Sequence, residues 1–206
     1  MIIEKYGLLL KRVTHGDIET IRQGRNRDFV RKKMLDQQRI STEQQEAWFH
    51  AINNSRHCLY FVIQHNGQSI GLAHSKDIDW ETREDEGGIF VWNEHYIGSG
   101  IPAIASIIMM QLCFSVVGLE RTYASIHPDN TEIQNYNLAL GYTFSESRNR
   151  MVLTRAAYQA HIGKLRRIAG QGKDVSALSA KDITIEEADR HTPLFQNMPT
   201  CLVQLA

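Results

Sequence analysis

The chain has 206 residues and carries 23 basic and 23 acidic side chains, so its formal net charge is zero. This length suits one domain of ordinary size with an added segment at one end. A balanced charge creates no overall field that would attract nucleic acid or an anionic membrane, and we expect neither as a partner.

The three cysteines, Cys58, Cys113 and Cys201, are odd in number, lie far apart and show no C-x-x-C spacing. They indicate reduced thiols in a cytoplasmic protein, and they predict neither a disulfide framework nor a metal site. Residues 1–5 reach charged side chains before any apolar run of signal-peptide length, so secretion is not indicated.

The first third of the chain predicts a strand and two helices. A leucine-rich run at residues 6–13 suits a strand, and residues 15–17 resemble the cap that opens a short helix. Residues 41–44, Ser-Thr-Glu-Gln, have the spacing of a capping box and predict a second helix through Ile52, with Trp48 on its apolar side.

A hairpin is expected next. The β-prone runs 58–64 and 69–75 are joined across Asn66-Gly67, the dipeptide that most favours a type I′ turn. The polar, acidic stretch 76–88 is expected to be a solvated connection that leads to a strand at residues 89–92.

Residues 101–119 contain no charged side chain and approach the ~20 residues needed to span a bilayer. Pro102, Gln111 and Gly118 interrupt the apolar run, and no basic cluster flanks it. The run therefore favours a buried helix packed against a sheet over a transmembrane helix.

The elements that follow continue the alternation of strands and helices. We expect a strand at 120–126, a helix at 131–140 ended by Gly141, and one long or two paired strands at 142–154. Residues 1–157 would then form one domain. The remaining segment, 158–206, carries no chemistry that we can name, and it would be a docking or dimerising appendage or simply a mobile end.

The segment from His95 to Gly100 lies between the strand at 89–92 and the long apolar helix. Two glycines spaced G-x-G, Gly98 and Gly100, let the backbone approach a phosphate closely. The helix that follows directs its free N–H groups and positive dipole end toward an anion. A plain strand-to-helix turn would explain the same residues, so the choice between that turn and a phosphate-binding turn depends on the neighbouring motifs.

The order β-α-α-β-β-β, then a glycine-rich turn opening a helix, then β-α-β resembles the GCN5-related N-acetyltransferase (GNAT) superfamily over residues 7–155. The family's pyrophosphate motif, Gln/Arg-x-x-Gly-x-Gly/Ala, is met by Gly98 and Gly100, whereas His95 stands where Gln or Arg is usual. Asn130, followed by Leu-Gly-Tyr at 140–142, resembles the family's "N…LGF" helix. The resemblance implies an α/β (α+β) fold with a mixed, mostly antiparallel sheet, flanked by helices and splayed between its fourth and fifth strands.

The resemblance further implies an enzyme that binds acetyl-CoA and transfers the acetyl group to a primary amine by direct attack. A strand edge offers amides to the pantetheine arm much as it pairs with a peptide, although the side chains of Phe90 and Trp92 could simply pack in the core. The implied cofactor-binding residues are Phe90, Val91, Trp92, His95, Tyr96, Ile97, Gly98, Ser99, Gly100, Asn130 and Asn137.

Direct attack requires a neutral amine, an oxyanion donor and a proton or hydrogen bond for the departing thiolate. The Val91 amide is the simplest oxyanion donor. In many family members a tyrosine serves the thiolate seven residues after the leading asparagine, but that position is Asn137 here, with Tyr136 about a hundred degrees round the helix. Asn137 could hydrogen-bond the sulfur, Tyr136 could be reoriented, or the thiolate could leave unassisted, because a thiol pKa of about 8.5 makes it a tolerable leaving group.

A carboxylate or a water chain would accept the proton of the amine. Glu86 is the first candidate because it lies just before the strand at 89–92, with Asp85 and Glu84 as alternatives, although all three could belong to an exposed acidic loop. His74 and His127 could relay protons from strand ends, or serve only the structure.

Residues 25–26, 30–31, 34, 40–41 and 46–49 resemble the GNAT branch that acetylates the 4-amino group of nucleotide-linked deoxy sugars, as in the pseudaminic acid pathway. Ribosomal-protein N-terminal acetyltransferases share parts of this pattern. We expect Arg25, Asn26, Arg31 and Trp48 to bind the acceptor, because arginines suit a nucleotide diphosphate. The arginines could equally solvate a helix face, and Trp48 could be core.

Three functions therefore stay open at this point. They are a small-molecule N-acetyltransferase acting on an amino sugar, a protein N-terminal acetyltransferase, and a non-catalytic acyl-CoA-binding module. A homodimer is possible in each case.

Overall fold

The computed structural model describes residues 1–146 and 149–196, and Cys201 lies outside them. The described strands form one sheet in the order β7-β8-β6-β5-β4-β3-β2-β1-β9. Their bounds are β1 (Ile2–Lys5), β2 (Leu8–Arg12), β3 (Leu59–His65), β4 (Gln68–Asp79), β5 (Glu84–Val91), β6 (Arg121–Ser125), β7 (Thr143–Phe144), β8 (Arg150–Thr154) and β9 (Ile183–Thr184). β5 and β6 are parallel and the other neighbours are antiparallel.

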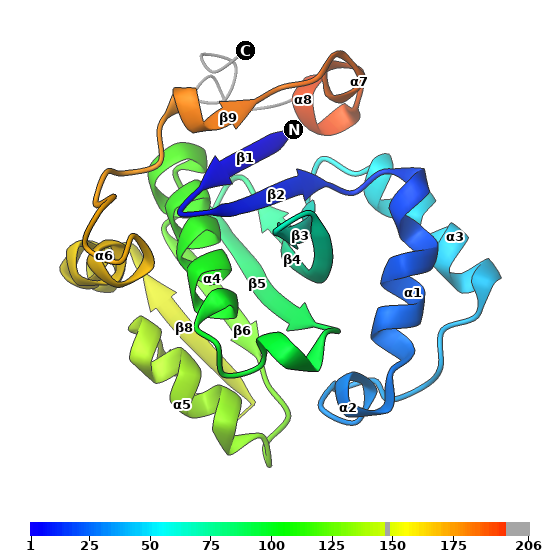
Figure 1. Cartoon of the computed structure of the whole chain (residues 1–206), viewed down its shortest axis with the longest axis horizontal. Helices are drawn as coiled ribbons and strands as arrows, with labels where there is room; N and C mark the ends of the chain where they lie inside the picture. Colours follow the sequence, from blue (N-terminus) through cyan, green and yellow to red (C-terminus); the bar gives the residue numbers. More distant parts are fainter. Residues whose placement is uncertain (147–148, 197–206) are drawn as a thin grey trace.

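Helices cover both faces of this sheet (Figure 1). Their bounds are α1 (Ile18–Asn26), α2 (Asp28–Arg31), α3 (Thr42–Asn53), α4 (Ile101–Gln111), α5 (Thr131–Leu140), α6 (Arg155–Ala169), α7 (Glu187–Arg190) and α8 (Pro193–Gln196). One apolar cluster joins the sheet to α4, α5 and α6, and a second, smaller cluster joins it to α1, α2 and α3. The expected mixed, mostly antiparallel sheet flanked by helices is confirmed.

The strand expected at residues 6–13 is present as β2, but its place as the first strand is wrong, because the chain begins with a hairpin. β1 pairs with β2, and Tyr6 and Gly7 form the turn between them with φ angles of 52° and 77°. Charged residues concealed β1 in the sequence, but its inward positions include Ile3 and Lys5, both of which are buried.

The solvated connection expected at residues 76–88 is also wrong. β4 continues to Asp79, β5 begins at Glu84, and only a short turn separates them. Alternate residues of a strand face opposite sides of a sheet, so Asp85 is only 2% exposed while its acidic neighbours face the other side. The acidic composition therefore hid a strand.

Other local predictions hold. Asn66 and Gly67 have φ angles of 50° and 74°, as the two central residues of a type I′ turn require. The capping box before α3 is present, because the side chains of Ser41 and Gln44 each accept a hydrogen bond from the other residue's backbone N–H. Of the two alternatives for residues 142–154, the structure has two paired strands, β7 and β8.

The long apolar run forms α4, which continues as a π-helical turn at Leu112–Val117. Its side chains pack against the sheet, and Ile107, Ile108 and Phe114 are almost fully buried. In the part of the chain that the structure describes, no helix is both long and apolar enough to cross a membrane.

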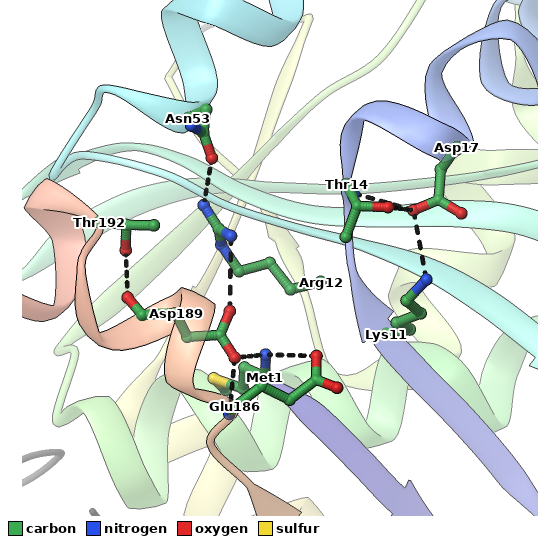
Figure 2. Close-up of polar contacts among 9 residues, drawn as sticks. All are labelled: Met1, Lys11, Arg12, Thr14, Asp17, Asn53, Glu186, Asp189 and Thr192. Carbon is green, nitrogen blue, oxygen red and sulfur yellow. Dashed lines mark hydrogen bonds and ion pairs between the residues drawn. The ribbon is translucent and has the colours of Figure 1, made fainter.

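The C-terminal segment packs on the first strands of its own chain, since β9 pairs with β1 (Figure 1). Figure 2 shows that the Asp189 carboxylate of α7 contacts the N-terminal amine of Met1 and the Arg12 guanidinium, the latter at 3.4 Å. Arg12 also donates to Asn53 on α3 at 2.8 Å. Among the roles expected for this segment, docking onto its own chain fits these contacts, and its separation as a second unit stays a prediction.

Candidate active site

β5 and β6 separate halfway along β5. They pair only at Glu84, Asp85 and Glu86, and from Gly87 onward β5 pairs with no described strand on that side. A narrow hollow of about 120 Å³ opens at this point, closed over by α4 and α5. The expected splay between the strand leading to the glycine turn and the next strand is therefore confirmed.

The free edge of β5 presents backbone amides to this hollow. Trp92 N–H donates to the Ile70 carbonyl in β4 at 2.9 Å. Amides of successive strand residues point to opposite edges, so Val91 N–H points away from β4, toward the splay. The side chain of Trp92 is 5% exposed and, with Phe90, belongs to the second apolar cluster. The Trp92 ring packs in the core, whereas the Phe90 ring is only partly buried and lines a second hollow described below, so on the side of the splay the backbone is left for a ligand.

The turn at residues 95–100 follows at the end of β5. Gly98 and Gly100 have φ angles of 77° and 83°, and no atom lies within 4 Å of the position that a Cβ would take at either residue. Ser99 N–H is bonded to Tyr96, but among the described residues the N–H groups of Gly98 and Gly100 have no hydrogen-bond partner. Two free amides at the start of α4, with its dipole behind them, are suited to hold a phosphate.

The remaining residues of this turn hold it in place. Asn93 caps it by accepting from His95 N–H at 3.1 Å, and the Tyr96 hydroxyl lies 3.3 Å from His65 Nδ1. The Ile97 side chain is exposed. Within the described part of the chain, no contact gives His95 the role of the Gln or Arg usual at this position.

Helix α5 and its cap carry three further predicted residues, of which Tyr136 and Asn137 line the hollow and Asn130 does not. The Asn130 side chain caps α5 by accepting from Ile133 N–H at 3.3 Å. Asn137 is 7% exposed and lines the hollow. Tyr136 also lines it, but its hydroxyl lies 2.6 Å from Ser106 Oγ and 3.2 Å from the Pro102 carbonyl, both on α4. Burial raises the pKa of Tyr136 to about 12, so its hydroxyl stays protonated.

The acidic candidates lie in quite different surroundings. Glu86 accepts from Ser125 at 2.7 Å and pairs with Lys76 at 2.9 Å. Burial raises its pKa, but these two partners lower it by more, so the pKa lies below the usual value and Glu86 stays ionised. Glu84 is paired with Arg121. Neither Glu84 nor Glu86 lines the narrow hollow or the second hollow described below.

Asp85 is buried on the opposite face of β5 from Glu86. Ser75 donates to it, and burial raises its pKa to about 6. It does not line either hollow, and neither does His127, which lies 3.8 Å from Asp129. These two residues are therefore not placed to meet an acceptor amine.

A second, wider hollow of about 360 Å³ lies between the sheet, α1, α3 and the segment after α2. Its lining includes the charged residues Arg25, Asp36 and Arg39 and the aromatic residues Trp48, Tyr60 and Phe90. His74 of β4 lines both this hollow and the narrow one. The two hollows thus meet at one side chain.

The four predicted acceptor residues divide into two pairs. Arg25 and Trp48 line the wide hollow. Asn26 does not, because its amide group is bonded to both the N–H and the carbonyl of Ile40, each at 2.8 Å. Arg31 is held by Asp28 at 3.0 Å and by the Gln37 carbonyl at 2.8 Å. Asn26 and Arg31 position the segment that forms the wall of the hollow.

A family model described as "Acetyltransferase (GNAT) domain" matches residues 7–158. The chain belongs to this family. It is an N-acetyltransferase that uses acetyl-CoA as its acetyl donor. No curated protein matches the chain.

The GNAT fold is also found in solved structures that resemble this one. A spermidine N-acetyltransferase from Vibrio cholerae in complex with CoA and spermine has a TM-score of 0.66 and 18% identity, over 75% of this chain and 99% of that one. A dodecameric form of the Vibrio cholerae enzyme has a TM-score of 0.59 and 18% identity, over 75% and 97%. At this identity the likeness concerns the fold.

Several residues in and around the candidate site were not singled out from the sequence. Lys76 and Ser125 hold Glu86, and Tyr60 stacks on His74 with ring centroids 5.1 Å apart. Their positions depend on the register of β3, β4, β5 and β6. The alternation of residues in the 59–65 and 68–79 strands could have placed Tyr60 and His74 on one face, but Ser125 becomes a neighbour only through the parallel pairing with β6.

Proposed function

We propose that this acetyltransferase acts on a primary amine whose molecule also carries a negatively charged group, with a nucleotide-linked deoxy amino sugar as the acceptor. The observation that carries the proposal is a buried, unpartnered nitrogen in the guanidinium of Arg25. One of its nitrogens, Nη1, is buried in the wall of the wide hollow and has no hydrogen-bond partner among the described residues. A buried donor without a partner is costly, and a phosphate oxygen would satisfy it.

The charge of the wide hollow supports the same class of acceptor. Arg25 and Arg39 contribute two positive charges, and Asp36 is the one carboxylate in the described lining. Polyamines carry several positive charges, and this lining would repel them. The polyamine specificity of the structural neighbours therefore does not transfer readily to this chain.

Shape and apolar surface are also consistent with a nucleotide sugar. A volume of about 360 Å³ lies within the range of small-molecule sites. Trp48 and Tyr60 meet edge to face with centroids 5.2 Å apart, and both line the hollow. Such rings suit the apolar face of a sugar or a base.

The donor would lie across the narrow hollow. The free amides of Gly98 and Gly100 would hold the pyrophosphate, and the open edge of β5 would bind the pantetheine arm. The Val91 N–H would then stabilise the oxyanion, and the amide of Asn137 would donate a hydrogen bond to the sulfur. The hydroxyl of Tyr136, held by Ser106, supports the helix rather than the thiolate.

The test compares CoA release with nucleotide amino sugars, N-terminal peptides and polyamines. In Arg25→Met, KM for a phosphorylated amino sugar should rise about 10- to 100-fold, the cost of one charge-assisted hydrogen bond. KM for acetyl-CoA should not change in this variant. The control is Arg167→Met, which removes an exposed arginine on α6 and should change neither KM for the amino sugar nor KM for acetyl-CoA. Turnover restricted to peptides or polyamines, or an unchanged KM in Arg25→Met, would refute this acceptor class. Tight acetyl-CoA binding without turnover would favour a non-catalytic module.

Two further proposals concern the setting of the enzyme. A cytoplasmic location is supported by Cys58 and Cys113, which are both free thiols. A homodimer remains a prediction from the sequence, to be tested by sedimentation.

A further inference from the structure

His74 lies at the only point shared by the two described hollows. Its ring stacks on Tyr60 with an interplanar angle of 27°, and Tyr60 in turn rests against Trp48. On the other side, the ring lies over the backbone of Gly88, its partner on β5. The plane of the imidazole is therefore set by packing, and no described residue forms a hydrogen bond with the ring.

The nitrogens of this ring are available. Nδ1 is buried and has no hydrogen-bond partner in residues 1–146 and 149–196. Buried polar atoms in folded proteins are nearly always bonded, so an exception between two substrate hollows indicates an atom kept for a ligand. A histidine that served the structure alone would be expected to donate to a backbone carbonyl, as His57 does to Ile78 at 2.6 Å.

We propose that His74 is the proton acceptor of the transfer, taking a proton from the acceptor ammonium as it enters the junction of the two hollows. This proposal rests on the proposed function. The imidazole lone pair takes one proton of the ammonium, and the freed nitrogen lone pair attacks the acetyl carbonyl carbon. When the C–S bond breaks, the second proton passes from nitrogen to the thiolate, and His74 releases its proton to water.

The charges around His74 suit this task. Burial lowers its pKa to about 4, so the imidazole is neutral at neutral pH and its lone pair is not occupied by a proton, although the same burial makes it a weaker base than a free imidazole. An ammonium enclosed in the same hollow also loses its water, which lowers the pKa of the amine and offsets the lowered pKa of His74. The ionisable groups that face His74 are Tyr60 on β3, Lys76 and Asp77 on β4, Glu86 on β5, Arg25, Asp36 and Arg39 across the wide hollow, and Cys113, Tyr136 and Tyr142 across the narrow one.

Gly88 makes room for the ring. A Cβ at this position would lie 2.5 Å from Cε1 and 2.6 Å from Nε2 of His74, which is closer than atoms can approach. Gly88→Ala should therefore push the imidazole away from the acetyl site while leaving its chemistry unchanged. Gly88 acts as a positioning residue for His74.

The experiment measures kcat/KM against pH for the wild type and for His74→Gln, with His50→Gln as the matched control because His50 is exposed on α3. The amines are the acceptor panel above and, as a probe that needs no specific recognition, ethylamine at high concentration. If His74 deprotonates the ammonium, wild-type kcat/KM should be flat between about pH 6 and pH 8. Without the imidazole, only the free amine reacts, so a plot of log kcat/KM against pH should rise with a slope of one for His74→Gln.

For an amine with a pKa of about 9, about 1% is free at pH 7, so His74→Gln should lose about 100-fold there and only a few-fold at pH 9. Gly88→Ala should show a smaller loss with the same slope. If the wild type acetylates an amine and His74→Gln matches its rate and pH profile, the role of His74 is refuted while the proposed function stands. If the wild type transfers acetyl to no amine, ethylamine included, both the role of His74 and the proposed function are refuted.

Discussion

Gly98→Val tests where the diphosphate of the donor is bound. Gly98 has φ of 77°, a conformation that a β-branched residue adopts only under strain. We expect this strain to cost about 1–3 kcal/mol of folding free energy, a fall in Tm of about 3–10 °C for a chain of this size. The valine side chain would also stand in the open space in front of the two free amides.

The loss of binding should be much larger than the loss of stability. Each charge-assisted hydrogen bond to a phosphate contributes about 1.5–3 kcal/mol. Losing the bonds from Gly98 and Gly100 would therefore weaken CoA binding by about 3–6 kcal/mol, or about 100- to 10,000-fold. Calorimetric titration with CoA would measure this, and titration with pantetheine, which lacks the diphosphate, should give the same affinity in the variant and the wild type.

Gly67→Val is the matched control. Gly67 has φ of 74° in the β3–β4 turn, and like Gly98 it has no atom within 4 Å of a Cβ position. It should therefore lower Tm by a similar amount and leave CoA affinity unchanged. Unaltered CoA affinity in Gly98→Val, or an equal loss in Gly67→Val, would show that the turn does not hold the diphosphate.

Two further substitutions address the acidic residues of β5. The pKa of Asp85 is raised from 3.8 to about 6, mainly by burial, so its stabilising contribution is complete below pH 3.8 and is lost as pH rises through about 6. As pH rises from 3.8 to about 6, the free energy of unfolding of Asp85→Asn should therefore increase by about 3 kcal/mol relative to that of the wild type, from about 2 pKa units at 1.36 kcal/mol each. Urea unfolding would measure this, and the same pH dependence in both proteins would contradict it. Glu86→Gln removes a negative charge near His74 but leaves the imidazole in place, so kcat/KM should fall less than 10-fold and stay flat between about pH 6 and pH 8. A slope of one in this variant would return the role of proton acceptor to Glu86.

The parts of this fold that depend on neighbouring residues could be predicted from the sequence. The Asn66-Gly67 turn and the Ser41 capping box each follow from a few consecutive residues whose backbone chemistry leaves little choice. The splay of the sheet and the glycine turn came from the family resemblance, because no periodicity indicates where a strand loses its partner. The alternating burial within residues 76–88 was missed, since charged residues on the solvent face outnumber the buried Ile78 and Asp85.

The candidate site depends more heavily on distant partners. Asn26 belongs to the predicted acceptor motif, yet its amide is occupied by Ile40, a pairing that no helix pattern could indicate. The docking of the C-terminal segment joins Met1 to Asp189 across 188 positions of sequence. Such contacts exist only after the sheet has formed, and so they could not be predicted from local composition.

The two adjacent glycines of β5 explain how a donor hollow and an acceptor hollow come to meet. A Cβ at residue 87 would lie 2.9 Å from Thr122 Oγ1 in β6, and one at residue 88 would lie against the His74 ring. The pairing of β5 with β6 ends at the residue just before them, Glu86. Glycine weakens a strand and marks a close approach of other groups, and here it leaves space on both faces of β5 at once. A side chain at either position would narrow the space between an incoming amine and the thioester, and for this reason Gly88→Ala should impair transfer.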